Sequence, residues 1–152
     1  MLNIIRTDSN NQDFISLVSE LDTELAIRDG EDHAFYHQFN KIDALQHVVV
    51  AYFNNQAVGC GAIKDFNNTT QEVKRMYVRK EFRGQGIAIE ILQNLENWAF
   101  ALGFKKCVLE TGIHQPEAIA LYLKCEYFKT SNYGQYQGVE NSICFEKELS
   151  AV

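Results

Sequence analysis

Proline is nearly absent from this sequence, since Pro116 is the only one in 152 residues. Long apolar runs are also missing, and none approaches the roughly 20 residues that a membrane-spanning helix needs. The first residues, MLNIIRTDSNNQ, lack the basic region and apolar core of a secretory signal, so we expect a cytoplasmic protein with no membrane partner. The length and the 46% hydrophobic content fit one domain, over residues 1–152, with one core.

Metal-binding and disulfide patterns are missing as well. No C-x-x-C pair occurs, so we expect buried thiols rather than disulfides or zinc ligands. The four cysteines are Cys60, Cys107, Cys125 and Cys144. His33 and His37 have the spacing of a metal pair, but the residues between them lack the glutamate of H-E-x-x-H. We expect a helix surface or part of a substrate pocket there, and no metal.

Positive charge is scarce, because 14 lysines and arginines face 20 acidic residues and give a formal net charge of −6. This balance argues against a general nucleic-acid binder. Residues 74–83, KRMYVRKEFR, are the exception, with a net charge of +4. Such a patch on an acidic protein favours a small polyanionic ligand, although a solvated strand edge would carry the same charges. An RNA-binding module that uses this patch is a further alternative, and salt-sensitive RNA binding would be its sign.

Periodicity predicts strands and helices along the whole chain. Residues 2–7 are a candidate strand, a helix begins near Asp13, and residues 31–40 resemble a second, short helix. Three further strands are expected to form an antiparallel meander, over 47–53, 57–66 and 70–78. Two helices and three strands follow: helix 86–102, strand 105–110, helix 116–125, and strands 127–131 and 142–148. Strand 70–78, helix 86–102 and strand 105–110 make a β-α-β unit with parallel strands. We therefore expect an α/β fold with a mixed sheet and flanking helices.

The corner between strand 70–78 and the next helix predicts a phosphate site. Gly84 and Gly86 let backbone N–H groups approach a ligand, and the helix directs its positive end to the same place. Arg83, with help from Arg79 or Lys80, adds charge-assisted hydrogen bonds. The corner is not a Walker loop, because G-x-x-x-x-G-K-[ST] is absent, and it lacks the third glycine of a Rossmann fingerprint.

RGQGIA resembles the pattern Q/R-x-x-G-x-G/A of the Gcn5-related N-acetyltransferase (GNAT) family. EVKRMYV before it is similar to that family's fourth strand, and QPEAIALYLKCEYF to a later helix. The resemblance covers nearly the whole chain and implies the GNAT fold, with acetyl-CoA as donor substrate. It implies that the pyrophosphate binds at Arg83, Gly84, Gln85, Gly86, Ile87 and Ala88. It also implies that the pantetheine arm binds along Met76, Tyr77 and Val78, with Gln115 nearby.

The same resemblance implies N-acetyl transfer to a primary amine by direct attack in a ternary complex. Tyr122 is at the family's tyrosine position and is the candidate acid for the departing thiolate, against a core tyrosine as alternative. Glu72 is the candidate base, through water, against a solvated strand carboxylate. Backbone N–H groups of Tyr77 or Val78 are candidates for the oxyanion site. The chain departs from the family pattern at Gln115, often asparagine, and at Glu126, usually glycine.

The acceptor is not identified by these motifs, so a small-molecule amine and a peptide amine both stay open, as does a homodimer. Residues 20–32 contain six carboxylates and one cation, Arg28, which predicts a cationic acceptor; an ordinary solvated acidic helix is the alternative. A non-catalytic domain that binds or senses coenzyme A is the main alternative to an enzyme.

Overall fold

The computed structural model describes residues 1–32 and 45–150, and these form a mixed α/β fold with a seven-stranded sheet. The sheet order is β1-β2-β3-β4-β5-β7-β6, and only β4 and β5 pair in parallel. The strands are β1 (Leu2–Thr7), β2 (His47–Phe53), β3 (Gln56–Asn67), β4 (Thr70–Val78), β5 (Lys106–Gly112), β6 (Phe128–Thr130) and β7 (Ser142–Glu148).

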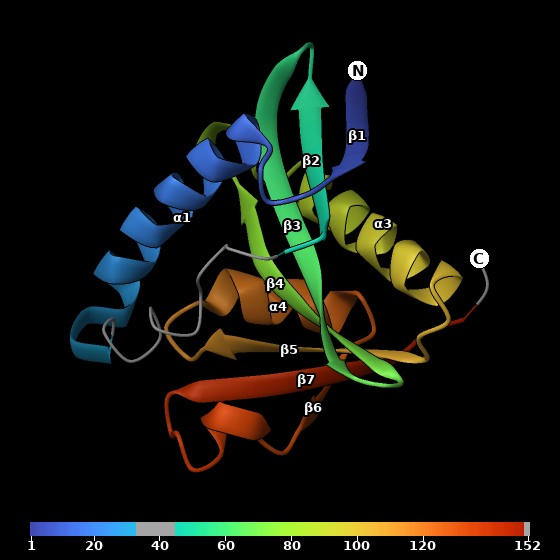
Figure 1. The fold of residues 1–152 in the computed structure, drawn as a ribbon. Helices are drawn as coiled ribbons and strands as arrows, with labels where there is room; N and C mark the ends of the chain where they lie inside the picture. The colour runs from blue at the N-terminus through green and yellow to red at the C-terminus, as the bar shows by residue number, and fades with distance from the viewer. Residues whose placement is uncertain (33–44, 151–152) are drawn as a thin grey trace.

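Helices cover both faces of the sheet (Figure 1). Those described are α1 (Gln12–Asp29), α3 (Ile87–Ala101) and α4 (Pro116–Lys124), with short 3-10 turns at Gly30–Asp32, Lys80–Phe82 and Gly134–Tyr136. α1 packs on one face of β2–β4 and α3 on the other. Within the described ranges, no helix is both long enough and apolar enough to cross a membrane.

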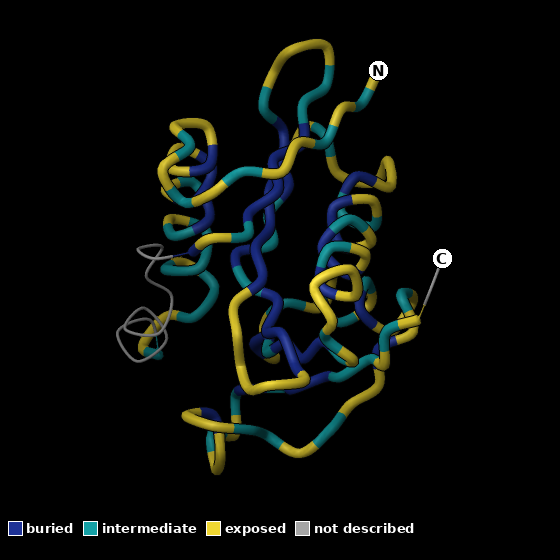
Figure 2. The backbone as a smooth tube through the Cα atoms, turned by 45° about the vertical axis from the view of Figure 1, so that its right-hand side comes forward, coloured by how far each residue is buried: buried dark blue, intermediate teal, exposed yellow. Residues whose placement is uncertain are grey.

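The central strands are apolar on both faces because both are covered (Figure 2). On β2, Val48 and Val50 belong to the cluster under α1, while Val49 and Ala51 belong to the cluster under α3. Gly61 lets α3 lie close to β3, because a Cβ at that position would come 2.9 Å from Leu95 Cδ1 and 2.6 Å from the Met76 sulfur.

β4 and β5 separate after a short parallel ladder. Their register runs from Thr70–Lys106 to Glu72–Val108 and ends there. The pairing of β4 with β3 is irregular at the next residues, and Arg75 has the positive φ of 59°. This bulge turns β4 away from β5, and on that side the second half of β4 pairs with no strand of the described residues. α4 lies at the opening.

The sequence predicted these elements closely. The predicted bounds of β1, β2, β4 and β7 are correct, α3 is one residue shorter than the expected helix at each end, and α4 is one residue shorter at its C-terminal end. The position of β7 between β5 and β6 was not predicted, because local patterns do not give strand order. Residues 31 and 32 lie in a 3-10 turn, and the rest of the expected short helix lies outside the described residues.

Candidate active site

Two hollows meet where β4 and β5 separate. A large groove of about 370 Å³ runs from this opening to the start of α3, and a small cavity of about 110 Å³ lies between β4, β5, α1 and α4. The residues that line both are Leu21, Met76, Gln115, Ala118 and Tyr122. A ligand bound in the groove can therefore place one end in contact with a second molecule bound in the cavity.

The glycine corner forms the far end of the large groove. Gly84 and Gly86 have φ values of +79° and +82°, and a Cβ at either position would meet no atom within 4 Å. Glycine is thus needed for backbone conformation rather than for space. The first helical hydrogen bond of α3 runs from Glu90 N to Gly86 O at 3.2 Å, so the preceding amide groups have no acceptor within the helix. Open space, free amides and a helix N-terminus suit a diphosphate.

Except for Gln85, the residues expected along the donor path line this groove. Met76, Tyr77 and Val78 border it on the edge of β4 that pairs with no described strand. Ile87 and Ala88 border it from α3, while Gln85 is exposed between the two glycines. Gln115 precedes α4 and lies between groove and cavity, where an amide side chain can contact an elongated ligand.

The arginines of the cationic patch are held by α1. Arg83 Nε donates to the Val78 carbonyl at 2.7 Å, and its Nη2 donates to Glu24 Oε1 at 2.9 Å. Arg79 donates from Nε and Nη2 to Glu20 at 2.8–3.1 Å, and this pairing lowers the pKa of Glu20. Arg83 borders the large groove and Arg79 does not, so only Arg83 of these two can contact a ligand in the groove.

A second ion pair joins α1 to α4 beside the same groove. Arg28 Nη1 donates to Glu117 Oε2 at 2.7 Å, and Arg28 Nε lies 4.0 Å from Glu24. The charges along the groove therefore alternate in the order Arg83, Glu24, Arg28, Glu117.

These pairings change the interpretation of the acidic segment 20–32. Glu20 and Glu24 are paired with the arginines above, Asp22 with Arg75, and Asp32 accepts from Asn141. They do not form one cluster of free carboxylates. Asp29 is the carboxylate of this segment that lines the small cavity.

Tyr122 lies at the junction of the two hollows. Its side chain is buried, and it projects from α4 next to the rings of Tyr127 and Phe145. Burial raises the pKa of Tyr122, and nearby Cys125 and Glu110 raise it further. The phenol therefore stays neutral and able to donate a hydrogen bond throughout the physiological pH range.

Glu72 lines the small cavity from β4, but both carboxylate oxygens have neighbours. Oε2 accepts from the Tyr133 hydroxyl at 2.7 Å, and Oε1 lies 3.9 Å from Lys74 Nζ. Burial lowers the pKa of Lys74, and Glu72 opposes that change.

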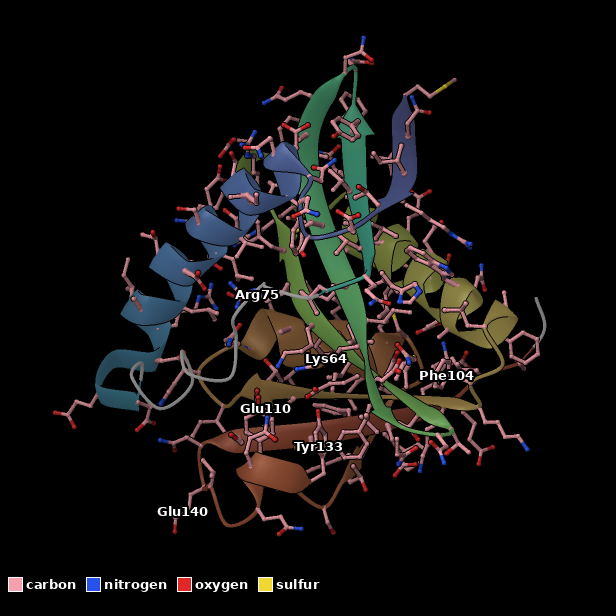
Figure 3. All side chains as sticks on the ribbon, in the orientation of Figure 1. Lys64, Arg75, Phe104, Glu110, Tyr133 and Glu140 are labelled. Carbon is pink, nitrogen blue, oxygen red and sulfur yellow. The ribbon has the colours of Figure 1, made fainter. Side chains whose placement is uncertain are left out.

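Glu110 is a cavity residue that sequence reasoning missed. It lies near the end of β5, and Tyr133 lies in the same region from the loop before β7 (Figure 3). Burial raises the pKa of Glu110 to about 7, and its Oε2 has no hydrogen-bond partner among residues 1–32 and 45–150. In the sequence, Glu110 is only the last residue of the predicted strand KKCVLE, and a glutamate at that place does not by itself indicate an active site.

The departure from the family pattern at Glu126 has a structural consequence. Glu126 has a φ of 72°, so the left-handed backbone that glycine usually supplies is present here.

Three cysteines are buried and Cys125 is half-buried, and all four are free. In residues 1–32 and 45–150, no three His, Cys, Asp or Glu side chains are arranged to hold a metal ion. His33 and His37 lie outside the described residues.

Comparison with known proteins identifies relatives over most of the chain. Residues 13–127 match the acetyltransferase (GNAT) family. An IAA acetyltransferase from Azospirillum brasilense is 38% identical over 102 residues, which are 66% of this chain and 67% of that protein. The uncharacterized N-acetyltransferase YjgM of Escherichia coli is 34% identical over 48% of this chain and 46% of its own length.

A solved structure from Klebsiella pneumoniae, described as a proposed acyl-CoA N-acyltransferase, has a TM-score of 0.83 and 29% identity, with 99% of each chain covered. A second structure is that of a GNAT family acetyltransferase from Elizabethkingia anophelis with acetyl-CoA bound. It has a TM-score of 0.68 and 20% identity over 97% of this chain and 98% of that chain, and at this identity it shows the fold alone.

Proposed function

The chain belongs to the acetyltransferase (GNAT) family, and we propose that it transfers the acetyl group of acetyl-CoA to a primary amine by direct attack in a ternary complex. The observation that carries this proposal is the meeting of the large groove and the small cavity at Met76 and Tyr122. One hollow accommodates an elongated anionic donor, and the other accommodates a small acceptor beside the donor's reactive end.

The donor substrate is held by groups along the large groove. The amides after Gly84, the N-terminus of α3 and Arg83 bind the diphosphate. The edge of β4 at Met76–Val78, which pairs with no described strand, hydrogen-bonds the pantetheine arm, and Gln115 contacts it from the start of α4. The acetyl-CoA-bound relative from E. anophelis supports this choice of donor by its shared fold.

The chemistry follows from the groups around the junction. The amine nitrogen attacks the thioester carbon, and a backbone N–H of Tyr77 or Val78 stabilises the oxyanion. Tyr122 donates a hydrogen bond to the sulfur as the C–S bond breaks. Because its pKa is raised, hydrogen bonding to the thiolate is favoured over formation of a free phenolate. Glu72 is a candidate for accepting the proton of the amine.

A domain that binds coenzyme A without catalysis is the competing function, since the groove alone would suffice for it. An assay of thiol release from acetyl-CoA with a panel of primary amines tests the proposal, with small aliphatic amines, diamines and N-terminal peptide amines in separate wells. Amine-dependent release at a rate above hydrolysis supports the enzyme. Calorimetric binding of acetyl-CoA without release for any amine class supports the binding domain.

A further inference from the structure

Three carboxylates from separate elements face the small cavity: Asp29 at the end of α1, Glu72 on β4 and Glu110 on β5. The acceptor amine arrives as an ammonium ion at neutral pH, so one of them has to be free to take a proton. Glu72 and Glu110 differ in what already contacts their oxygens, and this difference assigns their roles.

Glu72 is already engaged. The Tyr133 hydroxyl donates to one oxygen at 2.7 Å, and the Lys74 ammonium lies 3.9 Å from the other. The tyrosine hydroxyl therefore takes one of the acceptor positions on Oε2, and the lysine ammonium lies beside Oε1.

The carboxylate of Glu110 is less engaged than that of Glu72. Its Oε2 is buried and accepts no hydrogen bond from the described residues, and Glu110 itself lines the small cavity, so this carboxylate keeps acceptor capacity for a proton from a ligand. Its position also fits, because Glu110 on β5 and Tyr122 on α4 line the same cavity, with Gln115 on the turn between them.

The surroundings of Glu110 keep its basicity suitable for neutral pH. Desolvation is the largest influence and raises its pKa, and a hydrogen bond from Ser142 on β7 lowers it. Asp29 and Glu72 raise the pKa through their negative charges, while Lys74 lowers it. Tyr122 and Tyr136 face the same cavity as neutral phenols, and Arg75, which also lines it, is paired with Asp22. A base works best when its pKa is close to the working pH.

We propose that Glu110, rather than Glu72, is the catalytic base that accepts the proton of the acceptor amine; this rests on the proposed function. The ammonium gives one proton to Glu110, and the nitrogen then forms the N–C bond as the C–S bond breaks. The second proton leaves the nitrogen and ends on the coenzyme A sulfur, with Tyr122 at that atom. The amide keeps one hydrogen, and Glu110 returns its proton to water. Glu72 and Asp29 are positioning residues that act on Glu110 through charge.

The experiment compares Glu110→Gln, Glu72→Gln and Asp29→Asn by the pH dependence of kcat/KM, with the best acceptor from the amine panel. Glu146→Gln is the matched control, because Glu146 pairs with Lys106 outside the cavity. We expect wild type to gain activity as pH rises through about 7, the pKa of Glu110. Glu110→Gln should lower kcat/KM about a hundredfold at pH 7 and remove that rise. Asp29→Asn should shift the rise to lower pH, since it removes a negative charge.

A second readout separates proton acceptance from a merely structural role. A fluorinated analogue of the same acceptor is largely neutral at pH 7, so Glu110→Gln should impair its turnover much less than that of the parent amine. Equal impairment of both amines, or a wild-type profile in Glu110→Gln, overturns the proposal. A hundredfold loss in Glu72→Gln with a mild effect of Glu110→Gln also overturns it and assigns the base to Glu72. Failure of wild type with every amine is a different result, because it overturns the acetyltransferase function itself.

Discussion

Arg83 and Glu24 form an ion pair at the mouth of the large groove, with Arg83 Nη2 2.9 Å from Glu24 Oε1. Arg83 is therefore both the cation expected to bind the donor diphosphate and the partner of a carboxylate on α1. A diphosphate that binds this guanidinium competes with Glu24 for it. The strength of donor binding then depends on a residue that does not touch the glycine corner.

Arg83→Ala should weaken acetyl-CoA binding by about 1.5–3 kcal/mol, the scale of a hydrogen bond to a charged group. Isothermal titration calorimetry measures this change. Glu24→Gln should have the opposite sign and strengthen binding by up to about 1 kcal/mol, because the donor no longer displaces an ion pair. Unchanged affinity in both folded variants would remove Arg83 from the donor site.

Gly86→Ala tests the glycine corner against a matched glycine at the other end of α3. Gly86 and Gly103 both have positive φ, +82° and +97°, and open space around the missing Cβ. Each substitution should cost about 1–2 kcal/mol of stability through backbone strain. Only Gly86→Ala should also weaken acetyl-CoA binding, by tenfold or more, since it shifts the amides at the groove. Equal affinities of the two variants, measured by calorimetry, would contradict a diphosphate site at this corner.

Tyr122→Phe keeps the ring packing and removes the hydroxyl. We expect kcat to fall by about tenfold or more, with little change in acetyl-CoA affinity, because the hydrogen bond to the departing thiolate is lost. Tyr127→Phe is the control, since Tyr127 is buried next to Tyr122 but lines neither hollow. A Tyr122→Phe enzyme with wild-type kcat would leave this tyrosine with a packing role.

The raised pKa of Glu110 also predicts a pH-dependent stability. The folded protein holds this proton up to about pH 7, whereas the unfolded chain loses it near the ordinary glutamate value. This contribution to the free energy of unfolding is present in full below the unfolded pKa and is lost as pH rises through about 7. Glu110→Gln should therefore be more stable than wild type at pH 8, by up to about 3 kcal/mol, and similar at pH 4. Urea unfolding at the two pH values measures this difference, and an equal difference at both would contradict the shift.

Glu126→Gly should stabilise the fold by about 0.5–1 kcal/mol. Glu126 follows α4 with a φ of 72°, and Tyr127 N donates to Tyr122 O at 3.0 Å in the manner of a Schellman motif. Glycine removes the strain of the left-handed backbone, and its greater freedom in the unfolded chain limits the gain. Thermal unfolding with Glu140→Gly as a comparison checks this, since a loss of stability in Glu126→Gly would contradict the strain.

The sequence alone determined the features that depend on neighbours along the chain. Gly84, Gly86 and the start of α3 lie close together in the sequence, so the conformation of the corner follows from local backbone geometry, and its affinity for a diphosphate stays a prediction. Glu126 was identified for the same reason, because the backbone conformation at a helix end depends on the residue that directly follows the helix.

Only the tertiary structure decided the pairings between distant segments. The burial of Glu110 depends on α1, β4 and β7. These elements lie around Glu110 in the fold, although α1 and β4 precede it in the sequence and β7 follows it. Arg83 pairs with Glu24, which is 59 residues away in the sequence, and Glu72 accepts a hydrogen bond from Tyr133, which is 61 residues away. The electrostatic state of a carboxylate depends on desolvation and on nearby charges, and both arise only when the sheet and helices are assembled. The sequence therefore predicted a donor site from local residues, while the tertiary structure decided which carboxylates line the small cavity and what contacts them.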